Sequence, residues 1–108
     1  MCPEEDVVLR TLVVHERTEI RERVRRVLAP EGFDVEEAAD WTTATQLLRM
    51  TMPELLVASP FLRDVDVLAA LALVGRSSNI AVIALVPDDL GALGPLSLDR
   101  GADDFVRE

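Results

Sequence analysis

The chain contains no lysine: all eleven of its basic side chains are arginine. It has one cysteine, Cys2, so no disulfide can form within the chain and a cytoplasmic location is expected. Its longest apolar run, residues 67–74, is far too short to span a membrane. The acidic residues 1–6 lack the basic start and apolar core of a signal peptide. These absences exclude an internal disulfide scaffold, a membrane span and any site that depends on a lysine ammonium group.

The charge balance argues against a nucleic-acid partner. The formal net charge is −9, whereas a phosphate-binding surface needs clustered basic side chains. The one dense basic group, five arginines between residues 17 and 26, alternates with Glu16, Glu19 and Glu22. This alternation predicts a solvated helix face crossed by ion pairs.

A length of 108 residues allows one domain, with residues 1–6 expected to be flexible. Short apolar runs rich in β-branched residues alternate along the chain with segments of helical periodicity. This alternation predicts βαβ units, a parallel sheet and right-handed crossovers. The expected strands are residues 7–14, 33–38, 55–58, 80–86 and 104–107.

Capping and breaking residues set the expected helix ends. Thr18 is expected to cap a first helix that Pro30 and Gly32 end. Thr42 or Thr43 is expected to start a second helix that closes before Pro53. A third helix is expected from Asp66 to residue 76, and residues 88–95, with two glycines and a proline, are expected to form a loop.

Four stretches of the sequence carry a family resemblance. They are Leu12-Val13-Val14 with the polar residues after it, residues 31–40, residues 53–57 and the string Gly101-Ala102-Asp103-Asp104-Phe105-Val106. Together they resemble the receiver domain of response regulators in two-component signalling. The resemblance implies a flavodoxin-like α/β fold with three layers and a parallel five-stranded sheet in the order 2-1-3-4-5. In this family a final helix follows the fifth strand. Here residue 108 is reached before such a helix, so we expect either that a longer regulator continues the chain or that something else buries the apolar sheet face.

The resemblance also implies which positions carry the family's chemistry. Receivers bind Mg²⁺ with carboxylates after the first strand, accept phosphate on an aspartate ending the third, and use a hydroxyl and a lysine ending the fourth and fifth. At these positions the chain has His15, Glu16, Ser59, Val86 and Glu108. An acyl phosphate needs a carboxylate and nearby positive charge, so we expect a pseudo-receiver without phosphoryl transfer, cofactor, metal or enzymatic activity.

Two other uses of this altered pocket remain open. His15, Glu16, Ser59 and Glu108 could bind a transition metal or a small ligand, which would make the domain ligand-responsive. A hydrolase with Ser59 as nucleophile is disfavoured, since no glycine flanks Ser59 and Pro60 has no N–H to offer an oxyanion.

The remaining expectation is an interaction surface for a protein partner or a second copy of the chain. We expect it on the third helix, which is apolar all round, or on residues 87–100 with the fifth strand. Trp41 is either an exposed anchor or a lid on the sheet edge. Without a final helix, one apolar sheet face stays uncovered, which predicts a homodimer or poor solubility. The candidate contact residues are Leu73, Leu90, Leu93, Leu96 and Phe105.

Overall fold

The computed structural model describes residues 9–62, 65–67, 80–86 and 103–107. Its main sheet has five strands: β1 (Leu9–Val14), β2 (Phe33–Ala38), β3 (Leu55–Ala58), β6 (Ala81–Val86) and β7 (Asp104–Arg107). They pair in the order β2-β1-β3-β6-β7, and every pair is parallel. The predicted order 2-1-3-4-5 is therefore confirmed, with β6 and β7 as the fourth and fifth strands of this sheet.

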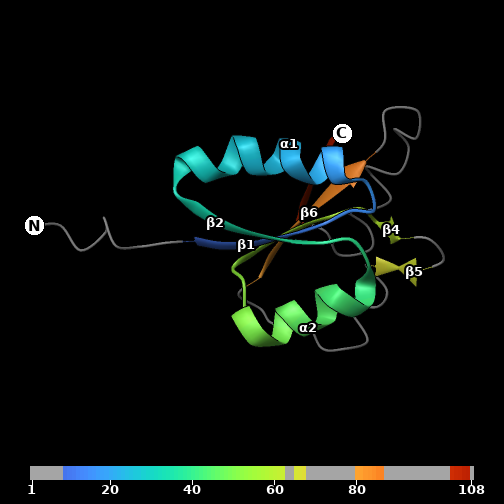
Figure 1. Cartoon of the computed structure of the whole chain (residues 1–108). Helices are drawn as coiled ribbons and strands as arrows, with labels where there is room; N and C mark the ends of the chain where they lie inside the picture. The colour runs from blue at the N-terminus through green and yellow to red at the C-terminus, as the bar shows by residue number, and fades with distance from the viewer. Residues whose placement is uncertain (1–8, 63–64, 68–79, 87–102, 108) are drawn as a thin grey trace, which may run out of the picture.

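The two described helices lie on opposite faces of the sheet, which gives the predicted three layers (Figure 1). Helix α1 (Thr18–Leu28) continues into a short 3-10 turn, η2 (Ala29–Glu31), and helix α2 (Trp41–Thr51) follows β2. Because side chains alternate along a strand, each face builds its own core. On the α2 face the core includes Leu12, Val14, Ala44, Leu56, Val82 and Val86; on the α1 face it includes Val13, Ile20, Val35, Val57 and Leu85.

Both helix starts differ from the sequence prediction. Thr18 is the first helical residue and not the cap; Arg17 holds the cap position, without a side-chain capping bond. Helix α2 begins at Trp41 because the Asp40 carboxylate accepts the N–H of Thr43 at 2.7 Å, so the aspartate caps it. Trp41 is half-buried and packs against the α2-face core. The predicted helix ends are confirmed: Gly32 follows η2 with φ +96°, and Pro53 follows the left-handed Met52.

A small hairpin follows the third strand, and the sequence analysis did not predict it. Strands β4 (Phe61–Leu62) and β5 (Val65–Asp66) pair antiparallel. At the open end of this hairpin the Val67 N–H donates to the carbonyl of Pro60 at 2.9 Å. Asp66 ends β5, and Val67 directly after it has helical backbone, in agreement with a third helix that starts at Asp66. The rest of that expected helix and the expected loop at 88–95 lie outside the described residues. No helix in the described part of the chain is long and apolar enough to cross a membrane.

Candidate functional site

The carboxyl edge of the sheet brings together three of the five predicted pocket residues. Val14 ends β1 and pairs with Ala58, which ends β3, so the residues that follow them, His15 and Ser59, are neighbours at this edge. The backbone N–H of Ser59 donates to the carbonyl of Val14 at 2.9 Å, which fixes the serine beside the end of β1. Val86 ends the next strand, β6. Glu16 follows His15 and is exposed, while Glu108 lies outside the described residues.

Val86 offers nothing to a phosphoryl group. Its side chain is fully buried and packs in the core on the α2 face. The half-buried Ser59 brings a hydroxyl to the end of β3, where the resemblance places a carboxylate. Among the predicted pocket residues that the structure describes, the edge therefore combines a histidine, a serine, an aliphatic side chain and one carboxylate, that of Glu16.

His15 is held by its neighbours as a structural residue. It is buried, its backbone N–H donates to the carbonyl of Ala38 at 3.1 Å, and its ring Nδ1 accepts the N–H of Arg17 at 3.0 Å. An imidazole nitrogen that accepts this N–H is not available to a metal ion. Within the described ranges, no three His, Cys, Asp or Glu side chains form a group that could hold a metal ion.

One guanidinium, that of Arg21, joins the loop after β1 to the end of β2. Its Nη1 donates to the carbonyls of His15 at 2.7 Å and Glu16 at 3.3 Å, and its Nη2 donates to Oγ1 of Thr18 at 3.1 Å. Its Nε forms an ion pair with Oε1 of Glu37 at 3.1 Å. The Arg21 side chain is only 13% exposed, so these contacts lie partly out of water.

Glu37 receives a second arginine on its other oxygen. Arg25 Nε donates to Oε2 at 2.6 Å from one turn further along α1. Burial pushes the pKa of Glu37 up, but the hydrogen bonds from Arg25 and Arg21 outweigh it, so the pKa lies below its ordinary value. The expected ion pairs along the helix surface are found for Arg17 with Glu19 at 3.3 Å and for Arg26 with Glu22 at 3.8 Å. Arg21 and Arg25 instead pair across to β2.

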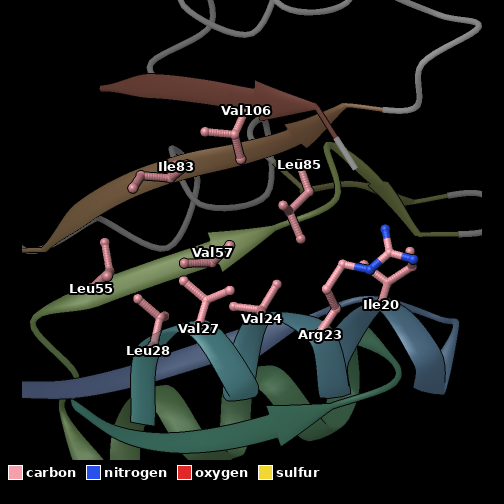
Figure 2. A pocket seen from close by; sticks show the side chains of 10 residues that line it. All are labelled: Ile20, Arg23, Val24, Val27, Leu28, Leu55, Val57, Ile83, Leu85 and Val106. Atoms are coloured by element: carbon pink, nitrogen blue, oxygen red, sulfur yellow. The ribbon is translucent and has the colours of Figure 1, made fainter. Parts of the chain in front are cut away.

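A second feature is an apolar groove between α1 and the sheet, with a volume of about 300 Å³. Figure 2 shows side chains from α1 and from β3, β6 and β7 facing one another across it, with Arg23 at one end. Two apolar lining residues are substantially exposed, Val27 at 64% and Val106 at 45%. The lining is Ile20, Arg23, Val24, Val27, Leu28, Leu55, Val57, Ile83, Leu85 and Val106. In the part of the chain that the structure describes, no second helix covers this face.

The side chains of the predicted contact residues are not among those that the structure describes. Leu73, Leu90, Leu93 and Leu96 lie outside the described residues, and of Phe105 only the backbone in β7 is described. Sequence reasoning missed the roles of Arg21 and Glu37, because nothing in a linear pattern shows which strand end a helical arginine reaches. It also missed Asp103, whose carboxylate accepts the N–H of Val82 at 2.8 Å while its own N–H donates to the Val82 carbonyl. The signal for Asp103 was present in the string 101–106.

Comparisons with known proteins give relatives and structural neighbours of one kind. No protein-family model matches the chain. It is 30% identical over 99 residues to the response regulator MprA of Mycobacterium tuberculosis (strain ATCC 25618 / H37Rv) and 31% identical to MprA of Mycobacterium avium (strain 104). Each alignment covers 91% of this chain and 43% of the relative. The chain therefore spans less than half the length of these curated relatives.

The solved structures support the same fold. The response regulator receiver domain protein from Clostridium thermocellum superposes with a TM-score of 0.78 at 17% identity, over 93% of this chain and 82% of that one. The Francisella response regulator 1452 receiver domain gives a TM-score of 0.77 at 21% identity, over 93% and 84%. Sequence relatives, fold and strand order agree: the chain is homologous to response regulators and has the fold of their receiver domains.

Proposed function

We propose that this chain is a phosphorylation-independent pseudo-receiver, a signalling module that acts in the cytoplasm through contacts with other proteins. We assign it no enzymatic reaction, no cofactor and no direct contact with nucleic acid. The observation that carries the proposal is the position of Ser59, which the N–H bond to Val14 holds at the carboxyl end of β3. Phosphoryl transfer to a receiver needs a carboxylate at this position.

The surrounding residues support the same conclusion. A serine hydroxyl is a poor acceptor without a general base and concentrated positive charge beside it. Glu16 leaves one carboxylate where the family uses a pair, and a hard divalent cation needs several oxygen ligands. Val86 is packed in the core, and the chain has no lysine to take up the charge of a phosphoryl group.

Intact-mass measurement after incubation with acetyl phosphate and Mg²⁺ tests the proposal. We expect no phosphoryl adduct on the natural chain. The variant S59D is the matched control, and we expect it to stay unmodified as well, because Val86 and the missing lysine are unchanged. An acid-stable adduct that S59A abolishes, or an acyl phosphate on any carboxylate, would refute the proposal.

We further propose that the protein contact is with a second copy of this chain, through the apolar groove beside α1. Its aliphatic lining and the exposed Val27 and Val106 support this, since water-exposed apolar patches of this kind favour association. V27E, which places a charge in the groove, should shift the species seen by light scattering from dimer to monomer. M50E is the matched control, because Met50 is 79% exposed on α2, on the opposite face. A natural chain that stays monomeric at high concentration would contradict this part.

A further inference from the structure

We infer that Arg21 is a positioning residue that locks the β1–α1 loop, residues 15–17, in one conformation through protein groups alone. The inference rests on the proposed function, because a domain that works without phosphorylation must set its carboxyl edge without a phosphoryl group. It concerns how that edge is held, which the homology to response regulators leaves open.

Helix α1 begins without a capping bond from the side chain at its cap position. A helix leaves its first backbone N–H groups without partners inside the helix, and a capping side chain normally satisfies one of them. Arg17 stands at the cap position and makes no side-chain capping bond. Instead, the ring of His15 accepts the Arg17 N–H from two residues earlier, so the orientation of this ring helps to define the start of the helix.

The end of β2 and the side chain of Arg21 together hold His15 and its loop in place. The His15 backbone N–H is tied to Ala38 at the end of β2, and the His15 and Glu16 carbonyls both accept from Arg21 Nη1. Arg21 itself is fixed by Glu37, the residue before Ala38 in β2. The loop is therefore tied to the end of β2 twice: by the backbone hydrogen bond from His15 to Ala38, and by the Arg21 guanidinium, which binds both the loop carbonyls and Glu37.

Position 21 requires an arginine because its side chain makes all of these contacts at once. The guanidinium donates in a fixed plane from three nitrogens, and here all three are used: Nε on Glu37, Nη1 on the loop carbonyls and Nη2 on Thr18. A lysine ammonium could neutralise Glu37 but could not reach the carbonyls and the carboxylate at once.

Arg25 provides an internal control. It binds the same carboxylate of Glu37 as Arg21, but none of its described hydrogen bonds goes to the loop, and its side chain is 45% exposed. R25Q and R21Q each remove one arginine from Glu37, yet only R21Q removes donors from the loop carbonyls. A comparison of the two variants separates a loop lock from a simple counter-ion.

Amide hydrogen exchange followed by NMR on the 108-residue chain tests the inference. In R21Q we expect the amides of His15 and Arg17 to exchange about tenfold faster or more, while R25Q leaves them within about twofold of the natural chain. R21K keeps the charge, and we expect it to speed exchange at the same two amides while the amide of Val13 in the core is unchanged. If R21Q does not fold, R21K alone decides the matter.

Three results would overturn the lock: equal effects of R21Q and R25Q, natural exchange rates in R21K, or faster exchange spread evenly over the core amides. A separate arm with Mg²⁺ and beryllofluoride tests the proposed function. Chemical-shift changes at the carboxyl edge there would refute phosphorylation independence, whereas the exchange rates of the Arg21 variants report only on the lock. The two failures are therefore distinguishable.

Discussion

Replacing Thr11 by valine should make the domain more stable. Thr11 lies in β1 with 1% exposure, and its neighbours in register are Val35 on β2 and Leu55 on β3. Within the described residues its hydroxyl oxygen has no hydrogen-bond partner. A buried hydroxyl without a partner costs about 1–3 kcal/mol relative to water, because the bonds it made with water are lost and not replaced.

The magnitude follows from the near-identical shapes of the two side chains. Valine replaces the hydroxyl with a methyl group, so no cavity opens. Two terms then raise the stability: the desolvation penalty of the hydroxyl disappears, and burial of the methyl group adds a small gain. Counting only the lower part of the penalty, the free energy of unfolding should rise by about 1–2 kcal/mol. In a chain of this size that raises Tm by at least about 4 °C.

Urea unfolding followed by the fluorescence of Trp41 measures the change, since this is the only tryptophan and it packs against the core. The midpoint should rise at constant m. The matched control is V13T, which puts an isolated hydroxyl two residues along on the same face and should lower stability by about 1–2 kcal/mol. A T11V variant as stable as the natural chain, or less so, would refute the reasoning and show that the threonine hydroxyl is hydrogen-bonded.

Substitutions at four further positions give sharp expectations. Because the pKa of Glu37 is lowered on folding, its contribution is fully present above its ordinary value of 4.5 and disappears as the pH falls through the lower folded pKa. E37Q should therefore cost about 1–2 kcal/mol at neutral pH and flatten the loss of stability below pH about 5, measured by urea titrations across pH. G32A should cost about 1 kcal/mol from backbone strain alone, since φ is +96° and nothing lies within 4 Å of the added methyl group; an unchanged urea midpoint would show that the turn relaxes. M52G, at an exposed position with φ 46°, should stabilise by up to about 1 kcal/mol in the same assay, and a loss of stability would contradict this. D103A should cost about 1–2 kcal/mol by leaving the N–H of Val82 without its carboxylate acceptor, whereas D103N, which keeps an acceptor oxygen, should cost less; equal losses would rule out the bond as the cause.

The sheet could be predicted from the sequence because buried parallel strands leave a strong signal. The runs 33–38, 55–58 and 104–107 match β2, β3 and β7 residue for residue. Strand β6 starts at Ala81, one residue later than expected, and residues 7–8 of the first expected strand lie outside the described residues. Helix starts were harder to predict, because Asp40, Thr42 and Thr43 can all act as caps. Which of them caps the helix depends on the position and direction of the chain where the preceding strand ends. The hairpin of β4 and β5 carries two residues a strand, too few for any periodicity to show.

Some features of the candidate site could likewise be predicted from the sequence, and others could not. Placing His15 and Ser59 at one edge required only that both follow parallel strands, a rule that holds without side-chain detail. The Arg21–Glu37 contact required knowing how α1 is rotated over β2, because several arginines of the same helix were equally close in sequence. Which of them turns inward depends on packing that brings residues sixteen apart together.

Strand β2 also limits how two copies of this domain can meet. It forms an outer edge of the sheet, with one row of backbone groups unpaired among the described strands, and it carries the exposed carboxylates of Asp34 and Glu36. A second β2 approaching to extend the sheet would set carboxylates against carboxylates, a repulsion that grows as water is expelled. Continuous sheets running from one molecule to the next are therefore disfavoured at this edge, and high salt, which screens carboxylates, is the condition under which such growth should first be seen.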